Sequence, residues 1–169
     1  MYAPAHRFHF FVTLPAPRPG DRAHGDGVFL PLGGRCQAGG LPPDLTSVFV
    51  LLEHRRGKDV HWDFMIELPG RGELATWRLA ADPAVERGPI AADAIFAHPR
   101  RFLDYEGPLR GDKGQVRRID RGEAEILPCA DDRLRCRLAG RVLRGVFELC
   151  AGAAGAWTWR VADADGTST

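Results

Sequence analysis

The stretch EHRRGKDVHWDFMIEL, residues 53–68, holds two of the six histidines of the chain and a regular alternation of residue types. From residue 60 onward, successive side chains fall on opposite faces of an extended strand. One face is apolar, and the other carries His61, Asp63, Met65 and Glu67. The apolar run SVFVLLEH, residues 47–54, also has strand length, and RRGKD between the two runs predicts a hairpin.

The residues that follow continue as short strand-like runs separated by turn signals. DRGE at 120–123 predicts a turn, and the Pro- and Ala-rich residues 80–99 leave room for one short helix. Roughly eight strands with little helix predict an all-β domain, an antiparallel barrel or sandwich. Three tryptophans, Trp77, Trp157 and Trp159, alternate with polar neighbours and are predicted core aromatics. The runs are ELATWRL (73–79), GQVRRI (114–119), AEIL (124–127), RLRCRLAG (133–140), RVLRGVFELC (141–150) and AWTWRVAD (156–163).

Length and composition predict one folded domain. A chain of 169 residues can bury a substantial core. Residues 1–46 are broken by Pro or Gly every few positions and show no regular period, so they predict an irregular extension. The folded domain is then expected over residues 47–163, followed by a tail at 164–169.

Charge and cysteine content limit the classes of function. The formal net charge of +1 gives no sign of a strongly basic nucleic-acid binder, so any basic surface must be local. Four cysteines without a C-x-x-C spacing are typical of reduced thiols in a cytosolic protein. No apolar run approaches the ~18 residues of a membrane span. These features predict a cytoplasmic monomer that does not associate with membranes.

Two histidines and one aspartate near the hairpin suggest a metal site. His61 and Asp63 share a strand face, roughly 7 Å apart along the strand. His54 ends the preceding strand, and the hairpin would bring it close to His61. Two imidazoles and one carboxylate form a recurring catalytic site for Zn²⁺, Mn²⁺ or Fe²⁺. The alternative is a solvated strand face without a ligand, since such a pair also arises by chance.

Several separated motifs, in the same order, resemble the N-terminal phosphoesterase domain of bacterial DNA ligase D. The resemblance runs from Val48 to Asp163, about two thirds of the chain. It rests on FVLLEHRRGKDVHWDFMIEL (49–68), LATWRL (74–79), HPRRFLDYEG (98–107) and the closing strands with their late Trp. It implies a compact antiparallel β-barrel of about eight strands with little helix.

The resemblance also implies an activity. Family members bind a divalent metal, typically Mn²⁺, and remove 3′-terminal phosphates and ribonucleotides from DNA ends. His54, His61 and Asp63 match the metal ligands, and His98 matches a catalytic histidine that contacts the phosphate. The implied partners are DNA 3′ ends and a separate ligase or polymerase that uses the new 3′-OH. Zn²⁺ or another divalent ion is the alternative to Mn²⁺.

The chain departs from the family at several charged or polar positions. Met65, Ala81 and Phe102 stand where the family has Arg, Lys and Tyr, and the family's upstream Arg falls near Ile90. Each lost charged contact to a desolvated phosphate could cost on the order of 2–5 kcal/mol. The alternative function is therefore a catalytically impaired module that binds DNA ends or a repair partner on the same fold.

Five cations lie near the proposed site residues in sequence. They could replace the charged contacts to phosphate that the departures remove. Three are in the hairpin loop and two follow His98 directly. If the site residues converge, these cations are expected to rim one concavity and contact phosphate. The alternative for the loop is a solvated basic turn. The five are Arg55, Arg56, Lys58, Arg100 and Arg101.

Overall fold

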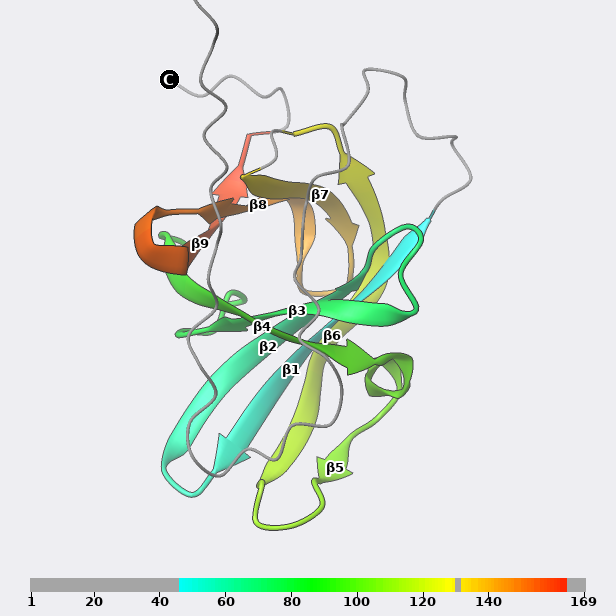
Figure 1. Ribbon diagram of the computed structural model, residues 1–169, viewed down its shortest axis with the longest axis vertical. Helices are drawn as coiled ribbons and strands as arrows, with labels where there is room; N and C mark the ends of the chain where they lie inside the picture. The colour runs from blue at the N-terminus through cyan, green and yellow to red at the C-terminus, as the bar shows by residue number, and fades with distance from the viewer. Residues whose placement is uncertain (1–45, 130–131, 164–169) are drawn as a thin grey trace, which may run out of the picture.

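The computed structural model describes residues 46–129 and 132–163 (Figure 1). These residues form nine strands and two short 3-10 helices, and they contain no α-helix. The strands are β1 (Ser47–Arg56), β2 (Asp59–Glu67), β3 (Glu73–Leu79), β4 (Ile90–Pro99), β5 (Gly107–Pro108), β6 (Gln115–Leu127), β7 (Arg133–Ala139), β8 (Arg144–Ala151) and β9 (Ala156–Ala162); the 3-10 helices are η1 (Arg100–Leu103) and η2 (Ala153–Gly155).

Eight of the strands form a closed antiparallel barrel. Their order is β1-β2-β3-β4-β9-β8-β7-β6, and pairing of β1 with β6 closes it. The ninth strand, β5, pairs only with β6 and lies outside the barrel. The predicted barrel is confirmed, and the sandwich alternative is excluded because closure leaves no free edge between β1 and β6.

The β1–β2 hairpin is longer than the sequence indicated. Pairing continues to Arg56 and Asp59, so only Gly57 and Lys58 form the turn. Gly57 has a φ of 61°, a left-handed conformation that glycine adopts without steric cost. In this register His54 lies directly opposite His61.

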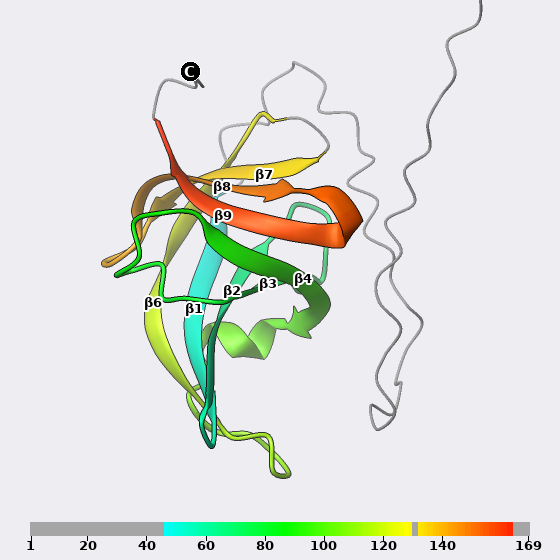
Figure 2. The ribbon, with the colours of Figure 1, turned by 90° about the vertical axis from the view of Figure 1, so that its left-hand side faces the viewer.

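Two hydrophobic clusters lie on opposite faces of β1 and β2. The main core fills the barrel and includes Phe64 together with Trp77, Trp157 and Trp159, so the predicted role of these tryptophans is confirmed. The second cluster, called the outer cluster here, packs on the outside of the barrel beneath η1, which lies beside β1 and below β4 (Figure 2). Its members are Val50, Leu52, Met65, Leu74, Leu103 and Val116.

Two predictions for local structure are wrong. DRGE is not a turn: β6 runs unbroken through it, bent by a bulge where the register against β1 shifts between Leu51 and Leu52. Strand β4 occupies residues 90–99, and the preceding residues form turns without an α-helix. Bulges of this kind bend a strand without ending it. Gly122 has a different task, because a Cβ there would lie 2.5 Å from the backbone oxygen of Ala139 on β7.

Asp120 also explains why the expected strand at 141–150 begins only at Arg144. Its buried carboxylate accepts backbone N–H groups from Arg141, Val142 and Leu143 at 3.0, 3.0 and 2.7 Å. These bonds hold the β7–β8 connection as a turn. Gly140 permits the close approach, because a Cβ there would lie 2.2 Å from the Asp120 carboxylate.

The remaining expectations on organisation concern the chain ends. The extension predicted for residues 1–46 and the tail at 164–169 lie outside the described residues, apart from Thr46. Within the described ranges, no helix has the length and apolar character needed to cross a membrane.

Replacing Asp120 by Ala is expected to destabilise the barrel. Three backbone donors would lose a charged acceptor, and the one at Leu143 is buried, so the free energy of unfolding should fall by about 2–4 kcal/mol. Urea unfolding measures this. The matched control is Asp104→Ala, because Asp104 is exposed and pairs only with Arg121 at the surface; it should cost less than about 1 kcal/mol. Equal losses would show that Asp120 does not hold the turn.

Candidate metal centre

The hairpin places His54, His61 and Asp63 on one face, outside the barrel. His54 and His61 are direct cross-strand partners, with ring centroids 4.6 Å apart and planes inclined by 72°. Asp63 follows two residues along β2 on the same face. One ligand atom from each residue lies within 4.8 Å of the others. The convergence expected from the sequence is confirmed, and the group could hold a metal ion.

The distances within this group fit a shared cation. His54 Nδ1 and His61 Nε2 lie 3.8 and 3.7 Å from the same oxygen, Asp63 Oδ2. This is too long for direct hydrogen bonds. Ligand bonds of about 2.0–2.2 Å around a tetrahedral ion place neighbouring ligand atoms roughly 3.3–3.6 Å apart. His61 Nε2 is buried and has no hydrogen-bond partner, so a cation between the three side chains would satisfy it.

The orientation of His54 is fixed from the side away from Asp63. Its Nε2 lies 2.6 Å from the carbonyl oxygen of Lys113. A carbonyl can only accept, so Nε2 donates the proton. When the ring is neutral, Nδ1 therefore presents its lone pair toward Asp63. Metal-ligating histidines commonly donate their second ring N–H to a carbonyl in this way.

Gly114 makes that carbonyl contact possible. It has a φ of 80°, and a Cβ at this position would lie 2.0 Å from the backbone oxygen of Arg55. A side chain there would push the β5–β6 connection away from the end of β1. The glycine-rich stretch GPLRGDKG thus serves the site structurally, through backbone approach.

Burial and pairing shift the pKa values of the three side chains in different directions. Pairing with Asp63 raises the pKa of His54, more than burial lowers it. Burial lowers the pKa of His61, which keeps that ring neutral. Burial alone would raise the pKa of Asp63, but pairing with His54 and the nearby Arg78 guanidinium outweigh burial, so the pKa lies below its usual value. The set is therefore an ionised carboxylate beside one neutral and one readily protonated imidazole.

Arg78 is the cation that the fold brings to this group. It lies opposite Asp63 in the β2–β3 register, and its Nε is 3.5 Å from Asp63 Oδ1. The side chain is 42% exposed, so its guanidinium can also reach a ligand in solvent. The signal in the sequence was weak, because the position is set by pairing between two strands. Met65, where the resemblance predicts Arg, is 1% exposed and packs in the outer cluster.

His98 lies near the three ligands but outside the group that could hold the ion. Its Nδ1 is 3.0 Å from Thr76 Oγ1, and the Thr76 hydroxyl donates its only proton to the carbonyl of Leu74 at 3.1 Å. His98 Nδ1 must then donate, which leaves the lone pair of the neutral ring on Nε2. Burial lowers the pKa of His98, more than the negative charge of Asp63 raises it.

Phe102 and Ala81 stand at two more positions where the resemblance predicts a polar or charged residue, and each has a structural explanation. Phe102 places its ring at right angles to that of His98, with centroids 5.1 Å apart, so it supports His98 by packing and offers no hydroxyl. Ala81 packs against the main core inside the barrel. Neither residue brings a charged group to the site.

The five cations predicted to rim one concavity do not form a single group. Arg55 lies on the opposite face of β1 from His54 and pairs with Glu53 there. Arg56 and Lys58 are at the hairpin end of β2, whereas Arg100 pairs with Glu67 at its other end. Arg101 lies over the ring of Phe102.

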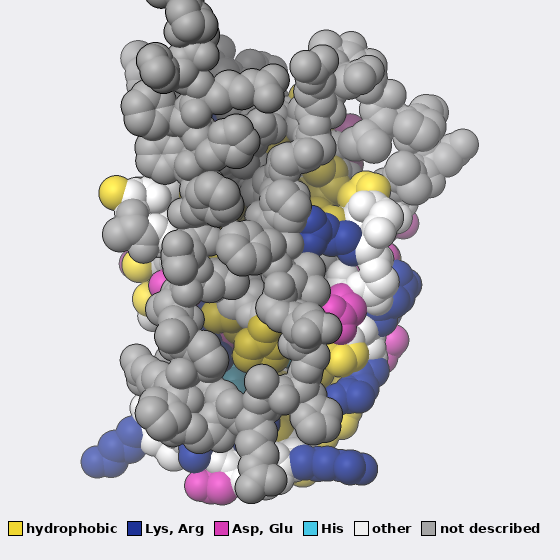
Figure 3. All heavy atoms as spheres, viewed as in Figure 1, with side chains coloured by type: hydrophobic (Ala, Val, Ile, Leu, Met, Phe, Trp, Pro, Cys, Tyr) yellow, Lys and Arg dark blue, Asp and Glu magenta, His cyan; other side chains and the backbone are white. Residues whose placement is uncertain are grey.

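The space-filling view also shows no single basic group. On the face of the molecule drawn in Figure 3, the visible basic side chains are spread along one edge and at the lower corners. The expectation failed because strand alternation and length separate residues that are close in sequence; contact of each with phosphate stays a prediction.

No protein-family model matches this chain, and no curated protein gives a significant match.

Replacing Gly114 by Ala is expected to weaken metal binding although Gly114 contacts no ligand. The added Cβ would move the Lys113 carbonyl away from His54, and losing an outer partner of this kind typically costs 10–100-fold in affinity. Isothermal titration with Mn²⁺ measures it. Gly111→Ala is the matched control, since Gly111 also has positive φ but nothing within 4 Å of its Cβ position. Equal effects from both variants would contradict the proposed role.

Metal binding is expected to tighten as pH rises. Because the pKa of His54 lies above its usual 6.5, a metal ion must displace one proton from it at pH 6–7. The Kd for Mn²⁺ should therefore fall about tenfold per pH unit below that pKa and level off above it. His61, with its lowered pKa, should add no second proton in this range. A Kd that does not change between pH 6 and 7 would contradict this assignment.

Proposed function

We propose that this chain is a divalent-metal-dependent phosphoesterase that acts on DNA 3′ ends and removes terminal phosphates or ribonucleotides. The observation that carries the proposal is the convergence of two imidazoles and a carboxylate on one strand pair, with a guanidinium in contact with that carboxylate. The motifs that resemble the ligase D phosphoesterase domain support the same reading and supply the substrate class.

In this proposal, His54, His61 and Asp63 hold the ion, with Mn²⁺ expected and Zn²⁺ the alternative. A divalent ion in such a site polarises a phosphoryl oxygen and lowers the pKa of bound water. The protein contributes a rigid frame, because the ligands stand on paired strands and the Lys113 carbonyl orients His54. Burial of His61 and Asp63 keeps competing water away from their ligand atoms.

Arg78 is the proposed phosphate-binding side chain. Its Nε is directed at Asp63, which leaves the terminal nitrogens for the phosphate oxygens. A guanidinium beside the ligand set would take over the task of the Arg that Met65 replaces.

His98 is proposed to accept a proton or hydrogen bond at Nε2. The Thr76 hydroxyl fixes its Nδ1 as a donor, and the lowered pKa keeps the ring neutral near pH 7. In this state His98 can orient a protonated phosphate oxygen or take a proton from attacking water. The resulting 3′-OH would be used by a separate ligase or polymerase in the cytoplasm of a bacterial cell.

The second candidate function, a module that binds DNA ends or a repair partner without turnover, is favoured by one observation. Met65, Ala81 and Phe102 are all engaged in packing and replace the charged or hydroxyl-bearing residues of the family. Arg78 compensates for one of these at most.

A turnover assay separates the two functions. Purified full-length protein with Mn²⁺ and a 3′-phosphorylated primer-template should release inorganic phosphate. His61→Ala, which removes a ligand, should lower the rate by more than about 100-fold. Arg137→Ala, on β7 and paired with Glu125, is the control and should retain the rate. Binding of the primer-template without release would support the binding module.

Arg78 variants test the phosphate contact within the same assay. Arg78→Gln should lower kcat/KM by about 30-fold or more, because a charged contact to a desolvated phosphate is lost. Mn²⁺ affinity should not weaken, since a positive charge next to the ion is removed. Arg137→Gln, on β7 and paired with Glu125, is the comparison and should keep kcat/KM within about threefold of the unmodified protein.

A further inference from the structure

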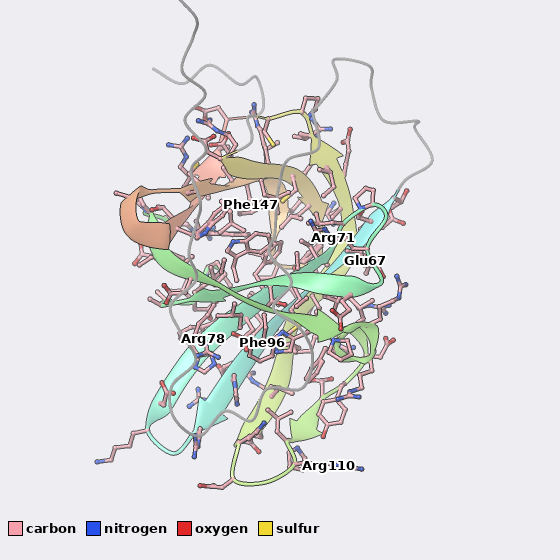
Figure 4. The ribbon with its side chains drawn as sticks, in the orientation of Figure 1. Glu67, Arg71, Arg78, Phe96, Arg110 and Phe147 are labelled. Atoms are coloured by element: carbon pink, nitrogen blue, oxygen red, sulfur yellow. The ribbon has the colours of Figure 1, made fainter. Side chains whose placement is uncertain are left out.

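An exposed aromatic side chain adjoins the candidate site. Phe96, on β4, is 73% exposed, and Arg78 and Phe96 both lie in the lower half of the barrel as drawn in Figure 4. Burying such a side chain would stabilise the protein, so its exposure forgoes stability. Phe96 is two residues before His98 and contacts it directly.

The ring of Phe96 is held in one orientation. It stacks on His98 with centroids 4.7 Å apart and planes inclined by only 23°. His98 is itself fixed by its hydrogen bond to Thr76 and by the perpendicular ring of Phe102. One face of the Phe96 ring is therefore occupied by the proposed catalytic histidine, while most of the side chain remains open to solvent.

The row of ring contacts at Phe96 offers little apolar surface for docking another protein. It runs from Phe96 through His98 and Phe102 to Tyr105, and none of the last three is more than 36% exposed. An apolar docking patch spans several hundred Å² of contiguous surface. An exposed aromatic ring beside a phosphate site instead matches the way proteins hold single-stranded nucleic acid, by base stacking next to backbone contacts.

We propose that Phe96 is a stacking platform for the base of the 3′-terminal nucleotide. The inference rests on the proposed function and extends it with a base-binding subsite. With the terminal phosphate at Arg78 and His98, the attached nucleotide can lay its base on the open face of Phe96. Every base has a π face, so the subsite selects a nucleotide over a bare sugar phosphate without selecting a sequence.

Fluorescence anisotropy with two 5′-labelled oligonucleotides tests this subsite. Both end in a 3′-phosphate; one carries a base on its last nucleotide and the other is abasic there. With Mn²⁺, the full-length protein should bind the first between about 5- and 150-fold more tightly, the range that stacking of one base provides. Phe96→Ala should abolish this preference, and Phe96→Trp should keep it.

The control variant is Val161→Ala, which removes an exposed apolar side chain on β9 and should leave the preference intact. Equal preference in Phe96→Ala and the unmodified protein, or no binding by the unmodified protein, overturns the inference. Failure of the base-stacking subsite can be distinguished from failure of the proposed phosphoesterase function. A preference that depends on Phe96 without phosphate release keeps the subsite and refutes the enzyme. Phosphate release by the unmodified protein, together with an equal base preference in Phe96→Ala, keeps the enzyme and refutes the subsite.

Discussion

The barrel and the site both depend on the double pairing of β1. This strand pairs with β2 on one side and with β6 on the other, and so it closes the barrel. Both of its faces are covered: Phe49 and Leu51 enter the main core, and Val50 and Leu52 enter the outer cluster. A shift of one residue would exchange the two faces, so the register is strongly fixed. The same register places His54 opposite His61.

The outer cluster lies beside the candidate site on the same face of β1 and β2, and it provides an apolar environment there. Met65, directly after the ligand region on β2, packs there together with Leu103 from η1. Burial of this face is the main reason that the pKa of His61 is lowered. Burial alone would raise the pKa of Asp63, but pairing with His54 and the charge of Arg78 outweigh it. Met65 thus contributes packing. The positive charge reaches the same carboxylate from the neighbouring strand.

A chain of oriented groups surrounds the candidate ion site. Carbonyl oxygens and hydroxyls fix the proton positions of two histidines, through Lys113 for His54 and Thr76 for His98. Aromatic contacts then continue from His98 outward to Phe96. Because each orienting group is backbone or a buried side chain, the polar atoms are arranged before any ligand binds, which is the condition for efficient electrostatic catalysis or tight binding.

The sequence by itself determined the β class, the central hairpin and the three converging side chains, because strand alternation and hairpin pairing are local rules that act within about 15 residues. It did not determine the course of β6 through Asp120, since that bend depends on a bulge and on a distant turn at residues 141–143. It also could not locate Arg78 at Asp63 or separate Arg55 from His54. Cross-strand register decided the first and strand alternation the second. Only the tertiary structure brings Lys113, Thr76 and Phe96 to the site, because their contacts join strands and loops that are far apart in the chain.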